Sequence, residues 1–473
     1  MSIKFYNTLE RKKVEFKPLM ENEVSLYTCG PTVYNYAHIG NLRTYIFEDI
    51  LKKTLEFNLL NVKHVMNITD VGHLESDSDT GEDKMALGAK REGKTVWEIA
   101  RFYEDKFFQD CVKLNIARPT ISCRATEHID HMIKFIQKLE EKGYIYVANG
   151  NVYFSIDKFP SYTEFAGLTM EGLEAGRRIE VDEGKRNPMD FVLWFTNSKF
   201  KNQIMQWDSP WGRGFPGWHL ECSVMSMEYL GKSIDIHCGG VDHIPVHHTN
   251  EIAQSESVTG GKWVNYWIHG EFLVLDDGKM SKSKGEFLTL SLLEEKGYEA
   301  IQYRFMCLLS RYRKQLVFSY GALDKAKQEY ESLKEKIKKV YKSSFLNEEQ
   351  IYNDKTAKYL EKFREQINDD LNTPNGITLI YEVLKDKELE AKEKIFLINE
   401  FDKVFSLELL DFDNNKRQSD IDQDKIQKLL IQRSEARVNK DWSKADEIRD
   451  KLTEMNIEII DNKEGSTWRV KDK

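Results

Sequence analysis

The stretch Tyr27–Asn41 constrains the fold more than any other part of this sequence, because it joins a short apolar segment to a long amphipathic one. Residues 24–27 predict a β-strand, and apolar residues recur at four-residue steps after Asn41, which predicts a helix with one buried face and Asn41 as its cap. Residues 63–69 predict a second strand. Since a strand–helix–strand unit normally has parallel strands and a right-handed crossover, the sequence predicts a doubly wound α/β fold.

Length and charge set the broad class of the protein. A chain of 473 residues is long enough for two to four domains. Its first residues lack the layout of a signal peptide, and no apolar run is long enough to span a bilayer. We therefore expect a cytoplasmic protein without a membrane segment. The net charge of −9 argues against general affinity for nucleic acid but leaves room for a local basic face.

The pattern of strands and helices changes several times along the chain. A strand–turn–strand pattern around Asn149–Gly150 predicts a hairpin, and residues 177–181 and 190–194 predict further strands, so this region looks inserted between two halves of the sheet. The sheet is expected to resume at 233–237, and a tight turn is expected at 274–278. Helices are expected from 320 to 409, followed by a charged linker and a small domain of two helices and a hairpin.

Two short motifs suit a polyphosphate. His38-Ile39-Gly40-Asn41 stands where a helix is predicted to begin, so main-chain N–H groups would face an anion. Lys279-Met280-Ser281-Lys282-Ser283 offers two ammonium groups and two hydroxyls on a short loop. Each has a simpler interpretation, a helix cap with a core histidine and a solvated basic turn, but the pair in this order is far more specific than either motif alone.

The six cysteines show no Cys-x-x-Cys spacing, so a disulfide framework or a zinc ribbon is not expected. His247 and Glu251 are four residues apart and would share one face of a helix. Cys29 and Cys222 would have to join them from separate loops. Spacing alone leaves open whether His247 is a ligand or an ordinary core or surface histidine.

Taken together, the two phosphate motifs resemble the HIGH and KMSKS signatures of the class I aminoacyl-tRNA synthetases. The closer resemblance is to the cysteinyl-tRNA synthetase family, and it covers nearly the whole chain. It is carried by the blocks at 29–34, 67–70, 187–194, 216–223, 247–255, 369–374 and 467–469.

The resemblance implies a set of functional residues. Matched one by one, the implied ligands of one Zn²⁺ are Cys29, Cys222, His247 and Glu251. The implied contacts to L-cysteine are Gly30, Thr69, Trp218 and Asp242. The implied contacts to ATP are Thr32, His38, Gly40, Asn41 and Lys282, and the implied catalytic residues are His38, Asn41, Lys279 and Lys282, with Mg²⁺ on the pyrophosphate. The implied contacts to tRNA(Cys) are Asp446, Arg449, Asp461 and Trp468.

The activity implied is the joining of cysteine to ATP as cysteinyl-adenylate, followed by transfer to the 3′-terminal ribose of tRNA(Cys). Zinc gives a physical reason for substrate choice, since a shaped pocket separates cysteine from serine poorly, whereas a metal ion favours the thiolate. This predicts that no hydrolytic editing site is needed. The implied reaction needs little covalent chemistry from the protein, so we expect no nucleophilic residue, and the implied catalytic groups would act by positioning and by stabilising charge on the phosphates.

The resemblance also implies a domain layout and a monomer. The layout comprises a Rossmann-type catalytic domain in two halves, 1–122 and 201–270, around a connective insertion, 123–200; a stem-contact region with the KMSKS loop, 271–320; a helical bundle, 321–415; and an anticodon-binding domain, 416–473, which is a small α+β domain.

Two positions depart from the family pattern. Asn41 stands where many class I enzymes have histidine, and Cys238, where relatives commonly have glycine, is a possible decoy ligand. Two other functions stay open at this point. One is a ligase that passes cysteine to a small-molecule amine, and the other is a zinc metallohydrolase built on His247 and Glu251.

Overall fold

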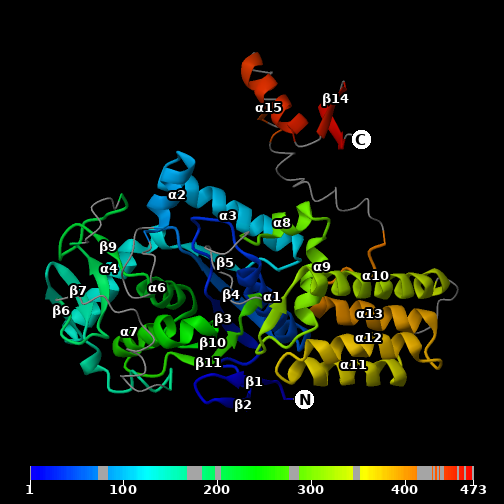
Figure 1. The fold of residues 1–473 in the computed structure, drawn as a ribbon, viewed down its shortest axis with the longest axis horizontal. Helices are drawn as coiled ribbons and strands as arrows, with labels where there is room; N and C mark the ends of the chain where they lie inside the picture. Colours follow the sequence, from blue (N-terminus) through cyan, green and yellow to red (C-terminus); the bar gives the residue numbers. More distant parts are fainter. Residues whose placement is uncertain are drawn as a thin grey trace. The chain divides into compact units, whose positions relative to one another are not determined.

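A five-stranded parallel sheet in the order β11-β10-β3-β4-β5 forms the centre of the first part of the chain (Figure 1). The order runs outward in both directions from the boundary between β3 and β10, as in a Rossmann-type sheet. The predicted doubly wound α/β fold is therefore confirmed. The strands are β3 (Glu23–Thr28), β4 (Asn61–Ile68), β5 (Ile121–Arg124), β10 (Ile234–Gly240) and β11 (Val264–Gly270).

The computed structural model describes residues 2–72, 84–167, 184–197, 204–275, 287–344, 352–412, 429, 432–433, 436, 441–454, 457–462 and 465–470. These residues divide into two compact units, Met1–Leu410 and Asp411–Lys473. Within the described ranges, no helix has both the length and the apolar character needed to cross a membrane.

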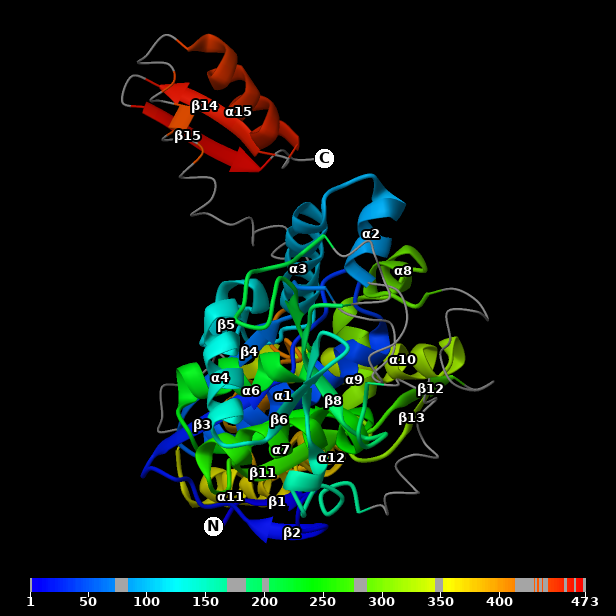
Figure 2. The same ribbon diagram turned by 90° about the vertical axis from the view of Figure 1, so that its left-hand side faces the viewer.

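Helices cover both faces of the sheet. Figure 1 shows α6 and α7 on one side and α1 on the other, and the view in Figure 2 agrees. The helices of this layer and of the neighbouring α2–α3 pair are α1 (Ile39–Phe57), α2 (Lys84–Glu92), α3 (Val96–Lys113), α6 (His219–Leu230) and α7 (Thr249–Thr259).

The start of α1 differs from the prediction. His38, not Asn41, caps the helix, because Nδ1 of His38 accepts a hydrogen bond from the Asn41 N–H. The expectation of one buried face is also wrong. Arg43, Glu48 and Asp49 are buried together with the apolar residues, since α1 is packed between the sheet and later helices of the chain.

The predicted insertion, 123–200, contains three strands of a separate four-stranded antiparallel sheet in the order β6-β7-β8-β9, and the fourth strand, β9, lies beyond the predicted end. The predicted hairpin is confirmed: β6 and β7 pair around Asn149 and Gly150, both of which have positive φ. The strand predicted at 177–181 lies outside the described residues. The elements here are α4 (Ile129–Glu141), β6 (Ile145–Ala148), β7 (Asn151–Phe154), β8 (Phe191–Phe195) and β9 (Phe215–Pro216).

Two further small sheets flank the central one. At the N-terminus, β1 (Lys4–Asn7) and β2 (Lys12–Glu15) form an antiparallel ribbon. After β11, the short strands β12 (Leu273–Leu275) and β13 (Leu316–Phe318) pair in parallel. The turn predicted at 274–278 extends beyond the described residues.

A helical region follows, as expected, and Figure 1 shows the long helices lying side by side. Its helices are α8 (Leu290–Glu295), α9 (Ala300–Leu308), α10 (Tyr320–Ser343), α11 (Asp354–Asn368), α12 (Thr373–Lys385) and α13 (Ala391–Phe405). The second unit contains α15 (Trp442–Glu454) and an antiparallel hairpin of β14 (Ile457–Asn462) and β15 (Gly465–Val470).

Candidate metal and substrate site

The candidate site lies at the carboxyl ends of β3 and β10, where the strand order reverses. In open α/β sheets this boundary is where ligands bind. Cys29 directly follows β3, and its main-chain N–H donates to the carbonyl of Cys238 near the end of β10. The loop that begins at Cys29 therefore starts at the point in the sheet where the topology favours a ligand site.

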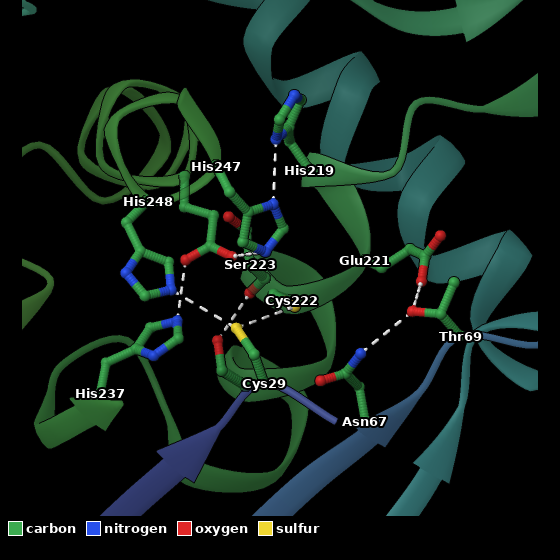
Figure 3. Close-up of polar contacts among 12 residues, drawn as sticks. Cys29, Asn67, Thr69, His219, Glu221, Cys222, Ser223, His237, His247 and His248 are labelled. Carbon is green, nitrogen blue, oxygen red and sulfur yellow. Dashed lines mark hydrogen bonds and ion pairs between the residues drawn. The ribbon is translucent and has the colours of Figure 1, made fainter. Parts of the chain in front are cut away.

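The four predicted metal ligands are brought together. Cys29, Cys222, His247 and Glu251 are all buried, and one ligand atom of each lies within 4.8 Å of the others. Cys222 comes from the first turn of α6 and His247 from a π-helical turn (Ile244–His248) (Figure 3). Glu251 comes from the start of α7. The expectation that His247 and Glu251 share a face is confirmed, since Nε2 and Oε1 lie 2.7 Å apart.

The arrangement fits a zinc ion on three grounds. The two sulfur atoms are 4.0 Å apart, close to the ~3.8 Å that two thiolates reach on a tetrahedral zinc with bonds of about 2.3 Å. Nε2 of His247 and Oε1 of Glu251 lie 2.7 Å apart and converge with the two sulfur atoms, as expected of groups that face a common centre. Two thiols, an imidazole and a carboxylate are donors that zinc accepts.

The charges of these groups are strongly coupled. Burial would raise the pKa of Cys222, but its hydrogen bonds to Cys29 and His247 lower it to about 6. Burial would lower the pKa of His247, but Glu251 and Cys222 raise it to about 10. The pKa of Glu251 falls to about 2 because the attraction of His247 and His237 exceeds the effect of burial. Cys222, His247 and Glu251 therefore favour their charged forms although they are buried, whereas burial raises the pKa of the Cys29 thiol well above its usual value.

Sequence reasoning missed a second layer of histidines. Nε2 of His248 lies 3.4 Å from the sulfur of Cys29, and Nδ1 of His248 lies 2.7 Å from Nε2 of His269. Nδ1 of His269 lies 2.7 Å from the hydroxyl of Thr8. If the Thr8 hydroxyl donates to Nδ1 of His269, then Nε2–H of His269 donates to Nδ1 of His248. Nε2–H of His248 in turn donates to the sulfur of Cys29. Burial lowers the pKa of both His248 and His269 and keeps these rings neutral.

His237 holds the carboxylate of Glu251 from the opposite side, with Nε2 2.8 Å from Oε2. His237 and His248 together with Cys29 and Glu251 make a second group whose ligand atoms converge. Two sequence signals pointed to them, the adjacent His247-His248 pair and a histidine inside a buried strand. Neither feature by itself predicts that His237 or His248 lies beside the candidate metal ligands, because the two histidines share no local spacing with the cysteines.

Trp218 and His219 surround His247. The rings of Trp218 and His247 are stacked, with centroids 3.9 Å apart and an interplanar angle of 12°. Nδ1 of His219 lies 3.0 Å from Nδ1 of His247. This contact leaves Nε2 of His247 for a ligand and supplies the second partner that a metal-bound imidazole usually has.

A separate buried chain of hydrogen bonds leads from Gly30 to α6. The Gly30 N–H donates to Asn67 Oδ1 at 2.8 Å, Asn67 Nδ2 donates to the Thr69 hydroxyl at 3.1 Å, and that hydroxyl donates to Glu221 Oε2 at 2.8 Å (Figure 3). Burial raises the pKa of Glu221 well above its usual value. Two of the predicted cysteine contacts, Gly30 and Thr69, thus belong to one network that ends beside Cys222.

Other predicted residues lie outside the buried cluster. Asp242 is exposed on the 3₁₀ turn after β10, and Thr32 forms an isolated parallel bridge with Thr69. Gly40 and Asn41 lie in the first turn of α1, and Asn41 is exposed. The N–H groups of Ile39 and Asn41 already donate to Leu288 O and His38 Nδ1, so this helix terminus offers an anion fewer main-chain donors than the sequence suggested.

The remaining predicted residues are only partly described. Lys279 and Lys282 lie outside the described residues. Asp446 and Arg449 are exposed on α15 and form an ion pair of 3.2 Å. Asp461 and Trp468 belong to the strands β14 and β15, but their side chains lie outside the described part. Cys238 is buried in β10 and belongs to neither of the groups of converging ligands found among the described residues.

Comparisons with known proteins identify the family of this chain. Three family models match the chain: "tRNA synthetases class I (C) catalytic domain" at 15–328, "DALR domain" at 362–407 and "Cysteinyl-tRNA ligase anticodon binding domain" at 423–469. A cysteine–tRNA ligase of Treponema denticola is 49% identical over 99% of this chain and 100% of its own length. One of Borreliella burgdorferi is 45% identical over 98% of this chain and 99% of its own length.

Among solved structures, a Mycobacterium tuberculosis methionyl-tRNA synthetase bound to methionyl-adenylate has a TM-score of 0.55 over 83% of this chain and 90% of that one. At 15% identity, this likeness shows the fold alone. The catalytic-domain match and the full-length relatives show the family directly. The chain therefore belongs to the cysteinyl-tRNA synthetases of class I.

Proposed function

We propose that this chain, as a cysteine–tRNA ligase, selects L-cysteine through one Zn²⁺ held by Cys29, Cys222, His247 and Glu251. The observation that carries the proposal is the convergence of these four buried groups within 4.8 Å at the boundary between β3 and β10. When bound, zinc supplies an affinity for a thiolate that the hydroxyl of serine does not match. This chain's own residues orient the rest of the substrate.

Within that proposal, the network from Gly30 to Glu221 places Thr69 beside the site, where it orients the amino acid together with Asp242 and Trp218. The aromatic face of Trp218 shields the His247 side of the pocket from water. The carboxylate of cysteine then attacks the α-phosphorus of ATP, pyrophosphate leaves, and the 3′-terminal ribose hydroxyl of tRNA(Cys) takes the cysteinyl group from the adenylate.

For ATP, we propose positioning by Thr32, His38, Gly40, Asn41, Lys279 and Lys282, with Mg²⁺ on the pyrophosphate. His38 supports this proposal because it caps α1, and its Nδ1 accepts from the Asn41 N–H in the same first turn that contains Gly40. These groups stabilise charge on the phosphates and form no covalent intermediate.

For tRNA, we propose that the unit 411–473 reads the anticodon through Asp446, Arg449, Asp461 and Trp468, and that the chain works as a monomer in the cytoplasm. The anticodon-domain match at 423–469 supports the first part. The six free cysteines suit a reducing compartment. The same match disfavours a small-molecule ligase, and the two signature motifs have no use in a metallohydrolase.

The four zinc ligands can be tested with a matched pair of variants. Cys222→Ser should lose bound zinc and raise the cysteine KM in ATP–pyrophosphate exchange. Cys238→Ser is the control, because Cys238 is as buried as Cys222 but does not converge with the other ligand atoms. If Cys222→Ser kept its zinc, the alternative group of Cys29, His237, His248 and Glu251 would be the metal site.

The reaction itself is tested by cysteine-dependent ATP–pyrophosphate exchange followed by charging of a tRNA transcript with a GCA anticodon. We expect both activities. Exchange without charging would favour the small-molecule ligase, and the absence of cysteine-dependent exchange would exclude both kinds of ligase.

A further inference from the structure

Arg43 is a buried cation whose hydrogen bonds go to main-chain carbonyls. It lies in the second turn of α1 and is 5% exposed. Nη1 donates to the carbonyls of Glu271 and Phe272 at 2.6 Å each, and Nη2 donates to the carbonyls of Lys314 and Arg311. Burial lowers the pKa of this guanidinium, so its position carries an energetic cost that the four acceptors offset.

These carbonyls belong to two segments that meet beside α1. Glu271 and Phe272 connect β11 to β12, whereas Arg311 and Lys314 precede β13. The segments are also joined to each other, because the Glu271 N–H donates to Tyr312 O and the Leu316 N–H donates to Phe272 O. The fork of Arg43 therefore fixes the base of the β12–β13 pair against α1. β12 ends at Leu275, shortly before Lys279 in the sequence.

The start of α1 also contacts residues 287–289, which follow Lys279 and Lys282 in the sequence. The Ile39 N–H donates to Leu288 O at 2.9 Å, and His38 forms an isolated antiparallel bridge with Thr289. The rings of His38 and Phe287 meet edge to face, with centroids 5.9 Å apart. The residues that precede 276 and those that follow 286 are thus both attached to the first two turns of one helix.

We propose that Arg43 is a positioning residue for the ATP step, which fixes the entry to the Lys279–Lys282 sequence relative to His38. The inference rests on the proposed function, in which His38, Lys279 and Lys282 all contact ATP. A displacement of about 1 Å at such a site is enough to lower the rate about 100-fold. Lysine cannot replace Arg43, because one ammonium group does not reproduce a planar fork that reaches two segments.

The test is ATP–pyrophosphate exchange with the full chain carrying Arg43→Met or Arg43→Lys. We expect the KM for ATP to rise at least 10-fold in both variants, while zinc content and the KM for cysteine stay within about twofold of the wild type. Arg304→Lys is the matched control. Arg304 is also fully buried and also donates to carbonyls, those of Phe405 and Leu114, but it holds neither side of the 276–286 sequence. It should lower the melting temperature and leave the KM for ATP unchanged.

Two results would overturn the inference. One is an unchanged KM for ATP in a folded Arg43→Lys protein. The other is a parallel rise of the KM for both ATP and cysteine, which a general loosening of the fold would give. Lys282→Ala separates this inference from the proposed function. If Lys282→Ala leaves the KM for ATP unchanged, the lysine assignment has failed and the inference fails with it. If Lys282→Ala raises that KM but the Arg43 variants do not, only the role of Arg43 is wrong.

Discussion

Two adjacent carboxyl groups on α1, Glu48 and Asp49, are both buried but have opposite surroundings. Glu48 is 1% exposed, and neither of its oxygens has a hydrogen bond among the described residues. Burial therefore raises its pKa well above 4.5. Burial would also raise the pKa of Asp49, but the charges of Arg304 and Lys53 lower it. Asp49 accepts from Arg304 Nη2 and Lys53 Nζ at 2.6 Å and from the Ala117 N–H at 2.8 Å.

The substitutions Glu48→Met and Asp49→Asn should accordingly act in opposite directions. A buried, unpaired polar group costs about 1–3 kcal/mol, so Glu48→Met should raise the free energy of unfolding by about that amount at pH 8. Asp49→Asn leaves the Arg304 charge buried without its carboxylate and should lower that free energy by about 3–5 kcal/mol.

The pH dependence gives each effect a second signature. The folded pKa of Glu48 lies above its unfolded value, so the free-energy cost of burying this group is smallest below about pH 4.5 and grows as the pH rises. The gain from Glu48→Met should therefore grow from pH 5 to pH 8. The folded pKa of Asp49 lies below its unfolded value, so the stability it contributes is present above about pH 4 and is lost as the pH falls.

Urea unfolding of the full chain at pH 5, 6.5 and 8, followed by tryptophan fluorescence, measures both substitutions and the pH dependence of Glu48→Met, and the same measurement below about pH 4 follows the loss of the Asp49 contribution. Trp194, Trp263 and Trp267 are fully buried in the first unit, so their emission reports its unfolding. The reasoning would be refuted if Glu48→Met destabilised the protein at pH 8, or if its gain did not change with pH. A smaller effect of Asp49→Asn than of Glu48→Met would contradict the assignment of the buried ion pair.

Two further predictions concern the site. Gly30→Ala should destabilise the protein by about 2 kcal/mol or more, because a Cβ would lie 1.7 Å from the carbonyl oxygen of Asn67 and the two strand ends would have to separate; thermal unfolding measures this. His248→Gln should weaken zinc binding about 10- to 100-fold by removing the ring that donates to Cys29, and competition with a chromophoric chelator measures this. Unchanged zinc affinity would show that the chain from Thr8 does not support the metal.

The sheet, the hairpin and the convergence of the four candidate ligands could be predicted because each left a local or family pattern. The hairpin at Asn149–Gly150 follows from turn chemistry, since both residues adopt positive φ. The cap of α1 could not be predicted in the same way. Asn41 is the better cap by residue type, but His38 accepts its N–H, and a carbonyl 249 positions after Ile39, that of Leu288, takes the Ile39 N–H.

The histidine layer was missed for a related reason. His237, His248 and His269 come from β10, a π-helical turn and β11, and their contacts depend on how these elements pack. Sequence periodicity predicts which face of a helix or strand is buried, but it does not predict the hydrogen-bond partners of a buried neutral histidine. The burial of a second face of α1 was missed because the elements that cover this face come from the last third of the first unit.

That burial bears on why α1 is rich in polar groups. Within twelve residues the helix carries His38 at its cap, Arg43 against the β12–β13 base, and Asp49, whose partner Arg304 also donates to the last residue of α13, Phe405. Each buried pair is expensive to desolvate, and apolar residues of similar volume would often stabilise a fold equally well. Hydrogen bonds from buried polar groups are directional, however, whereas apolar contacts are not. Arg43 fixes one segment and Arg304 another at defined hydrogen-bond positions, so α1 sets the geometry between the site, the segment before Lys279 and the helical bundle.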